Sequence, residues 1–205
     1  MKYMIDSKTG VSDVNSIFVN IQKLYNYKLR SSIDRDIVSG LLPRMGNPLH
    51  YNYLIMDGTE LNRILAKYNR QSLLPAAIDN QDFEDFRQLC DYAGKGTNAR
   101  KLSHLVFGKQ ILLKKLALKK ISSKFSRITR IWEKNHGIVV LHLFTESNHY
   151  EALSREYALI MSLGLNNLTN AINGCAYGAM KTDWNHFEIV NYGNMLLYNA
   201  FKMHR

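Results

Sequence analysis

The chain has 205 residues, 46% of them hydrophobic and 21% charged, which is ordinary for one globular domain with a core of its own. Its apolar runs are too short to span a bilayer, its N-terminus lacks a secretory signal, and Cys90 and Cys175 form no Cys-x-x-Cys pair. We therefore expect no membrane span, disulfide framework or structural zinc site, and a reducing location, nuclear or cytoplasmic. The net charge of +10 indicates a polyanionic partner, either nucleic acid or an anionic membrane surface.

The first half of the chain predicts an extension followed by a strand. Residues 1–45 are expected to form an N-terminal helical extension, because Ser12-Asp13 can cap a helix with apolar residues at helical spacing. Residues 46–205 would form the main domain, which begins with a strand over 51–56. Residues 59–80 look like an insertion with one short helix. A short helix or turn with Phe83, Phe86 and Leu89 then leads into a second strand that ends at Tyr92.

A glycine-rich segment after this second strand is the centre of the predicted site. Gly94 and Gly96 predict a sharp structural turn from the strand into a helix. Arg100 and His104 are four residues apart, so they share one face of that helix, close to Tyr92. A guanidinium in this position suits a phosphate, because its rigid fork can hold two oxygens at once.

Basic residues are concentrated between 100 and 134, a stretch that contains eleven lysines and arginines and a single acidic residue. Such localised charge is typical of a surface that binds nucleic acid. Over 111–132 the basic residues alternate with apolar ones, which indicates either a helix buried against a small sheet or an amphipathic helix on a membrane surface. The residues expected to contact phosphates are Lys95, Lys101, Lys114, Lys115, Lys119, Lys120, Lys124, Arg127 and Arg130.

The last third of the chain predicts a strand and two helices. The run 137–144 is the clearest strand, and His142 within it is expected to be a core residue. A helix begins at Asn148 and ends near Gly164, with Tyr150 in its apolar stripe. Glu156 lies beside that stripe, and helical periodicity alone favours a solvated surface group there. A C-terminal helix is expected over about 184–203.

Five motifs resemble the GIY-YIG nuclease superfamily in identity and order: Tyr53, Tyr92-Ala93-Gly94, Arg100, Glu156 and Asn170. Further blocks are similar to the subgroup of ankyrin-repeat and LEM-domain endonucleases, namely 53–57, 92–105, 131–140, 151–156, 163–170 and 174–178. The chain departs from the superfamily in carrying Asn52 before Tyr53 and Ala93 after Tyr92, and neither change removes a reactive group. The long separation between the two tyrosines matches the insertion of this subgroup.

The resemblance implies an α+β fold, with a small antiparallel sheet of about three strands flanked by helices and with N- and C-terminal helical extensions. It also implies an endonuclease that hydrolyses phosphodiester bonds in DNA, selects branched, flapped or bent DNA, and serves DNA repair. Its cofactor would be Mg²⁺ or Mn²⁺ held by Glu156 as a Lewis acid.

The resemblance assigns the remaining roles as follows. Arg100 would hold a non-bridging phosphate oxygen, and Tyr53, with Tyr92 nearby, would act as general base or orient the water. Because a phenol has an ordinary pKa near 10, a cation such as Lys95 or the metal would have to lower it. His104 would be a partner in this network and Asn170 a positioning residue. The alternatives are a non-catalytic nucleic-acid-binding module on the same fold and a mobile-element or restriction-type nuclease with sequence preference.

Overall fold

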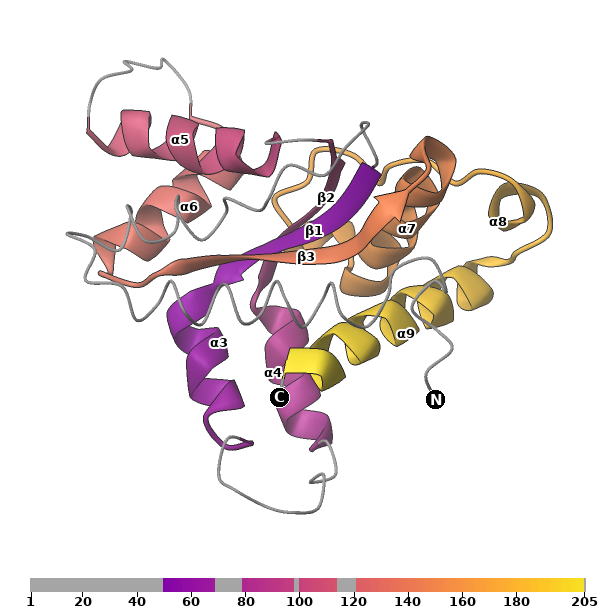
Figure 1. The fold of residues 1–205 in the computed structure, drawn as a ribbon, viewed down its shortest axis with the longest axis horizontal. Helices are drawn as coiled ribbons and strands as arrows, with labels where there is room; N and C mark the ends of the chain where they lie inside the picture. The colour runs from indigo at the N-terminus through magenta and orange to yellow at the C-terminus, as the bar shows by residue number, and fades with distance from the viewer. Residues whose placement is uncertain (1–49, 69–78, 98–99, 114–120, 205) are drawn as a thin grey trace.

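A computed structural model describes residues 50–68, 79–97, 100–113 and 121–204 of the chain (Figure 1). The elements in chain order are β1 (His50–Asp57), α3 (Gly58–Leu65), α4 (Asn80–Gln88), β2 (Cys90–Gly96), α5 (Arg100–Leu112), α6 (Ser123–Glu133), β3 (Ile138–Ser147), α7 (His149–Leu163), the 3-10 turn η1 (Leu165–Asn167), α8 (Ala179–Thr182) and α9 (His186–His204). The α+β prediction is confirmed, while the predicted N-terminal extension, 1–45, lies outside the described residues.

The sheet has three strands in the order β2-β1-β3, and β1 is antiparallel to both neighbours. Tyr53 is at the middle of β1, where it pairs with Gly94 on β2 and with His142 on β3. Alternate residues of a strand point to opposite faces, so Tyr53 and Leu54 belong to different cores. The register therefore decides which helices the tyrosine meets.

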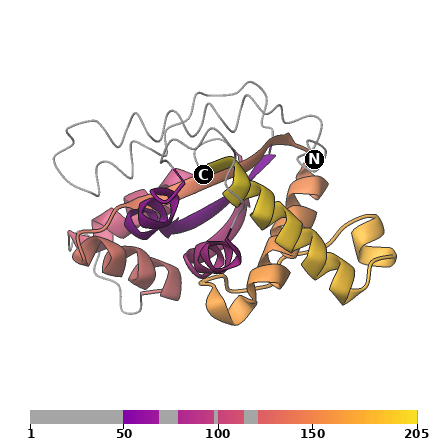
Figure 2. The same cartoon turned by 90° about the horizontal axis from the view of Figure 1, so that it is seen from below.

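Two groups of helices cover the two faces of the sheet (Figures 1 and 2). On the face of Tyr53, α5 and α6 contribute Leu105, Ile128 and Trp132 to the core. On the other face, α3, α4, α7 and α9 pack around a larger core that includes Phe86, Leu159 and Phe201. The apolar side of α6 is thus buried against the sheet, and none of the helices in the described ranges combines the length and apolar character that crossing a bilayer requires.

Local capping explains where two of the helices begin. Asp57 ends β1 and accepts hydrogen bonds from the backbone N–H groups of Thr59 and Glu60, at 3.0 and 3.2 Å, which starts α3. Asn148 starts α7 in a reciprocal capping box with Glu151, as its position in the sequence predicts. Helix α7 then ends at Gly164, whose φ of +81° favours glycine.

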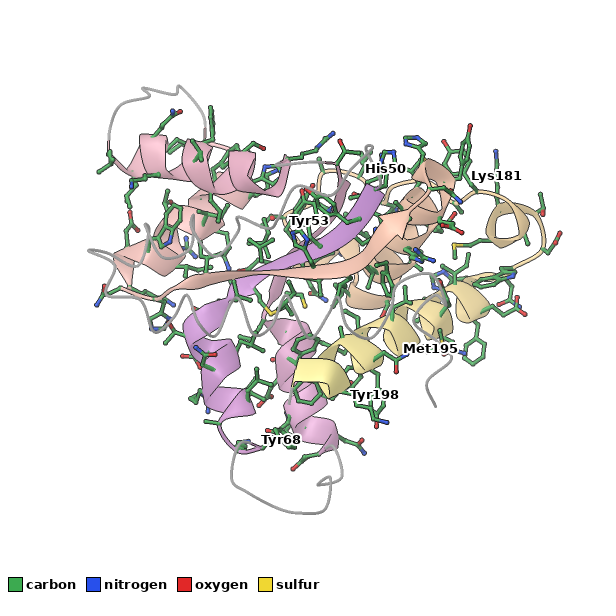
Figure 3. All side chains as sticks on the ribbon, in the orientation of Figure 1. His50, Tyr53, Tyr68, Lys181, Met195 and Tyr198 are labelled. Atoms are coloured by element: carbon green, nitrogen blue, oxygen red, sulfur yellow. The ribbon has the colours of Figure 1, made fainter. Side chains whose placement is uncertain are left out.

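The insertion between β1 and β2 reaches away from Tyr53 (Figure 3). Its described residues form two helices, α3 and α4, where the sequence predicted one helix and then a helix or turn. Tyr68 donates a hydrogen bond of 2.8 Å to Asp82, and Lys67 pairs with the same carboxylate. Figure 3 shows Tyr68 at the far end of these helices from Tyr53. The insertion therefore buttresses the fold rather than the site.

Three sequence-based predictions of local structure are wrong. Strand β2 continues through Gly96, so Gly94 and Gly96 are strand residues and not a turn. The helical region predicted over 111–132 is split, since α5 contains its first two residues and α6 begins only at Ser123. Tyr150 is 61% exposed rather than buried in the apolar stripe of α7, and its ring contacts His149 and Tyr177.

Candidate active site

The outer edge of β2 is covered by side chains from the segment that follows α7. Asn170 accepts a hydrogen bond of 3.1 Å from the N–H of Ala93 and donates one of 2.7 Å to its carbonyl oxygen. Two residues earlier on β2, the carbonyl oxygen of Asp91 accepts hydrogen bonds from the backbone and hydroxyl of Thr169, both 2.8 Å. These contacts satisfy an edge strand in place of a further strand. Asn170 therefore fixes the position of β2.

Glu156 binds the same edge of β2, two residues beyond Ala93. Its Oε1 accepts a hydrogen bond of 3.1 Å from the N–H of Lys95, and the side chain is half-buried. Burial raises the pKa of the Glu156 carboxyl, while the Lys95 hydrogen bond and the charges of Lys95 and Arg100 oppose the rise. The surface position favoured by helical periodicity is thus wrong, because α7 presents Glu156 to the edge of the sheet.

Two tyrosines and a histidine meet near the same end of β2, on the face of the sheet that α5 and α6 cover. Tyr53 is fully buried, and its ring centroid lies 5.8 Å from that of Tyr92. The hydroxyl of Tyr53 is 2.9 Å from Nε2 of His104, which comes from the first turns of α5. The imidazole also makes an edge contact with Tyr92 at 5.5 Å. The predicted convergence of phenol and imidazole groups is therefore present.

Gly94 is required where it stands by space rather than by backbone conformation. A Cβ atom there would lie 2.6 Å from a ring carbon of Tyr92 and 2.8 and 2.9 Å from Cζ and Oη of Tyr53. Both tyrosine rings pass directly over this glycine, and real Cβ atoms essentially never approach so closely. The absent side chain of Gly94 thus makes room for the tyrosine pair.

Gly94→Ala is accordingly expected to displace both rings. We expect a stability loss of about 1–3 kcal/mol from overpacking. We also expect the nuclease activity that the resemblance implies to fall about a hundredfold, because reactive groups are misplaced. Thermal unfolding and kcat measured on one preparation check the two effects. Gly96→Ala is the matched control, because its Cβ would lie 3.0 Å from the end of the Tyr51 side chain and needs only a small shift. Equal rates for wild type and Gly94→Ala would contradict this packing role.

Burial dominates the acid–base properties of the cluster. It raises the pKa of Tyr53 and of Tyr92 above the ordinary value, and the charge of Arg100 offsets only a small part of either rise. The expectation that nearby cations lower these pKa values is therefore not met by the protein groups. Burial, with the charges of Lys124 and Arg100, lowers the pKa of His104 to about 4, so its ring is neutral at pH 7.

Cationic side chains surround the cluster at different depths. Arg100 is exposed at the start of α5, and its charge acts on Tyr53, Tyr92 and Glu156 alike. Nζ of Lys124 lies 4.6 Å from the centre of the Tyr92 ring, where burial lowers its pKa. Among the side chains that the structure describes, these two cations act on the tyrosines.

The other predicted phosphate contacts are placed less directly. Nε of Arg127 is 2.6 Å from a carboxylate oxygen of Asp91, so this arginine also holds α6 to β2. Arg130 is exposed on α6. The side chain of Lys101 and the whole of Lys114, Lys115, Lys119 and Lys120 lie outside the described residues.

The fit of a divalent ion can be judged from Glu156. Within the described ranges, no group of three or more His, Cys, Asp or Glu side chains gathers that could hold an ion. The hydrogen bond to Lys95 uses Oε1, and one carboxylate completed by water and substrate oxygens is coordination that suits Mg²⁺. The residues present therefore fit an ion bound mainly by water and substrate oxygens, and not a closed metal cage.

Two histidines that the sequence did not single out lie beside Lys95. Nζ of Lys95 is 3.4 Å from Nδ1 of His149, and the rings of His50 and His149 make an edge contact at 4.8 Å. Burial, followed by the charges of Lys95 and His149, lowers the pKa of His50. No sequence signal marks this pair, because His50 starts β1 and His149 starts α7.

The chain is similar to known proteins over most of its length. The family model for the LEM-3-like GIY-YIG domain matches residues 50–205. The chain is 40% identical over 132 residues, 63% of its length, to the mouse ankyrin repeat and LEM domain-containing protein 1, and 32% identical over the same length to the human protein. It is 29% identical over 158 residues, 76% of its length, to the homolog from Caenorhabditis elegans. The matches span only 20–23% of these relatives, and no solved structure matches significantly.

Proposed function

The chain belongs to the LEM-3-like GIY-YIG domain family and is thus a nuclease domain, and we propose that it is a metal-dependent endonuclease that selects DNA by shape. One observation carries the proposal. Tyr53 pairs across the sheet with Gly94, and Glu156 is hydrogen-bonded to the very next residue, Lys95. A phenol and a carboxylate from distant parts of the chain are therefore brought to the same strand end, as hydrolysis of one phosphodiester requires.

Tyr53 and His104 are suited to pass a proton as a pair. Because its pKa is raised, Tyr53 stays protonated and cannot act as a free phenolate. The neutral His104, 2.9 Å away, can accept the phenol proton while Tyr53 takes one from the attacking water. The hydroxide formed attacks phosphorus and the bond to the 3′-oxygen breaks. The leaving alkoxide takes a proton from solvent, and His104 releases its own proton to solvent, which its low pKa favours. In this scheme Tyr92 packs beside Tyr53 and orients its ring.

In this proposal, Arg100 and a divalent ion at Glu156 stabilise the negative charge on the phosphoryl group. Arg100 is exposed, so its guanidinium can hold two phosphate oxygens, and lysine would replace it poorly. A divalent ion bound at Glu156 would supply Lewis-acid stabilisation of the phosphoryl and leaving oxygens. Glu156 contributes the charged ligand and Lys95 fixes its orientation, while Asn170 acts as a positioning residue through the backbone of Ala93.

The proposed preference for DNA shape rests on the many lysines and arginines in the stretch 100–134. The stretch 100–134 offers many lysines and arginines to phosphates, which positions DNA without reading its sequence. Branched, flapped or bent DNA presents phosphates in arrangements that a linear duplex does not. We infer that such DNA is the substrate and that the domain works in a reducing compartment, nuclear or cytoplasmic, since Cys90 and Cys175 are both free.

The decisive experiment incubates the full chain with four-way junctions, flaps and linear duplexes, with Mg²⁺ or Mn²⁺ or with EDTA. We expect cleavage of the branched substrates with either metal, and none with EDTA. Substrate shifted in a gel but never cut would instead identify a non-catalytic binding module. Cutting of linear duplex at one sequence would identify a nuclease with sequence preference.

Arg130→Glu is expected to weaken binding to every DNA sequence by the same factor. One fewer phosphate contact should reduce the slope of log affinity against log salt by about 1. Fluorescence anisotropy with two unrelated sequences at several salt concentrations measures both quantities. Lys202→Glu is the control, because this exposed residue near the end of α9 changes net charge equally. Equal affinities for the two variants would remove Arg130 from the interface.

A further inference from the structure

A cavity of about 420 Å³ opens beside the first turns of α7, separate from the tyrosine cluster. It lies between α7, α8 and α9, and four of its lining residues are aromatic: Tyr150, Tyr177, Trp184 and Tyr192. The rings form two contacting pairs, Tyr150 with Tyr177 at 5.1 Å and Trp184 with Tyr192 at 5.3 Å. The volume is that of a small-molecule site.

The walls of this cavity are held in place, although several rings are open to solvent. The N–H of Tyr177 donates a hydrogen bond of 3.0 Å to Oγ of Ser154, which fixes the segment before α8 to α7. Tyr150 is 61% exposed, and Trp184 and Tyr177 are each 37% exposed. Aromatic rings that remain accessible are suited to stacking on a planar ligand.

A continuous path of side chains joins the cavity to Glu156. Lys95 binds Glu156 through its N–H and approaches His149 through Nζ, at 3.1 and 3.4 Å. The ring of His149 contacts Tyr150 at 5.4 Å, at the mouth of the cavity. Figure 3 places His50 and Lys181 along the same edge of the molecule. Cationic and polar groups therefore lead from the candidate active site to the aromatic rings.

From this continuity we propose that the cavity stacks an unpaired nucleobase of the DNA substrate. Tyr150 and Glu156 are six residues apart on α7, a rise of about 9 Å at 1.5 Å per residue. A stacked strand rises about 3.4 Å per nucleotide, so we expect the captured base within a few nucleotides of the cut. Aromatic stacking would bind any of the four bases, since every base has a π face. The proposal deepens the proposed nuclease function and rests on it.

The test uses the full chain carrying Glu156→Gln, so that DNA stays intact, and flapped DNA with 2-aminopurine at successive positions around the junction. Stacking quenches this base analogue. We expect quenching on binding at one position within a few nucleotides of the junction, and its loss in Trp184→Ala. Affinity for flapped DNA should fall about tenfold, while affinity for a blunt duplex stays unchanged. Trp184→Phe should restore quenching, because it keeps an aromatic ring.

Phe187→Ala is the matched control, since Phe187 is 71% exposed on α9 and does not line the cavity. Quenching that persists in both Trp184→Ala and Tyr150→Ala would overturn the proposal. So would a change in sedimentation of the DNA-free protein on Trp184→Ala, which would mean that a second copy covers the rings. Quenching with no cleavage by the wild type would refute the nuclease function and leave base stacking standing.

Discussion

Glu156→Gln is expected to lower the rate of DNA cleavage by about a thousandfold or more, an effect of the size seen when a transition-state charge contact is lost. The amide keeps the shape of the side chain and can still accept the hydrogen bond from Lys95. It removes the negative charge that a divalent ion requires. Single-turnover cleavage of a four-way junction with saturating protein measures the effect on chemistry alone.

The controls for this variant separate catalysis from folding and binding. Glu133→Gln changes the charge by the same amount at an exposed position on α6 and should cut at the wild-type rate. The thermal midpoint of Glu156→Gln should not fall, because burial already disfavours the charged carboxylate. Cleavage by Glu156→Gln at the wild-type rate with Mg²⁺ would refute the assignment of this residue.

Tyr53→Phe is expected to reduce cleavage by a factor between about a hundred and ten thousand, the range for loss of a proton-transfer group. The ring and its contact with Tyr92 are retained, so the sheet and its register should persist. Only the hydroxyl that lies 2.9 Å from His104 is removed. Cleavage kinetics together with circular dichroism distinguish a chemical defect from a folding defect.

Coupling between the two residues provides a sharper test of the proton path. Because Tyr53 and His104 are proposed to act as one unit, Tyr53→Phe/His104→Ala should be no slower than the slower single variant. Tyr198→Phe removes a hydroxyl from α9, far from Tyr53 in Figure 3, and should have no effect. Multiplicative losses in the double variant would show that the two residues act independently.

Local sequence patterns determined the helices and strands, because each helix or strand depends on residues that are near neighbours in the chain. The apolar run 137–144 predicted β3, and Asn148 with Gly164 marked the two ends of α7. His142 is buried against Tyr51, as its place in an apolar strand predicted. The ordered motifs also identified the family, which the match over 50–205 confirms.

Only the tertiary structure decided what these residues contact. Glu156 bonds to a residue 61 positions earlier and Asn170 to one 77 positions earlier, so neither position on the edge of β2 can follow from helical periodicity. Gly94 suggested a turn, yet its real constraint is the space taken by two tyrosine rings that the sheet register brings over it. The acid–base state of Tyr53 and His104 depends on burial between layers. The amino-acid sequence determines which reactive side chains are present and which helix or strand carries each one. Long-range packing determines the distances between these side chains and their pKa values.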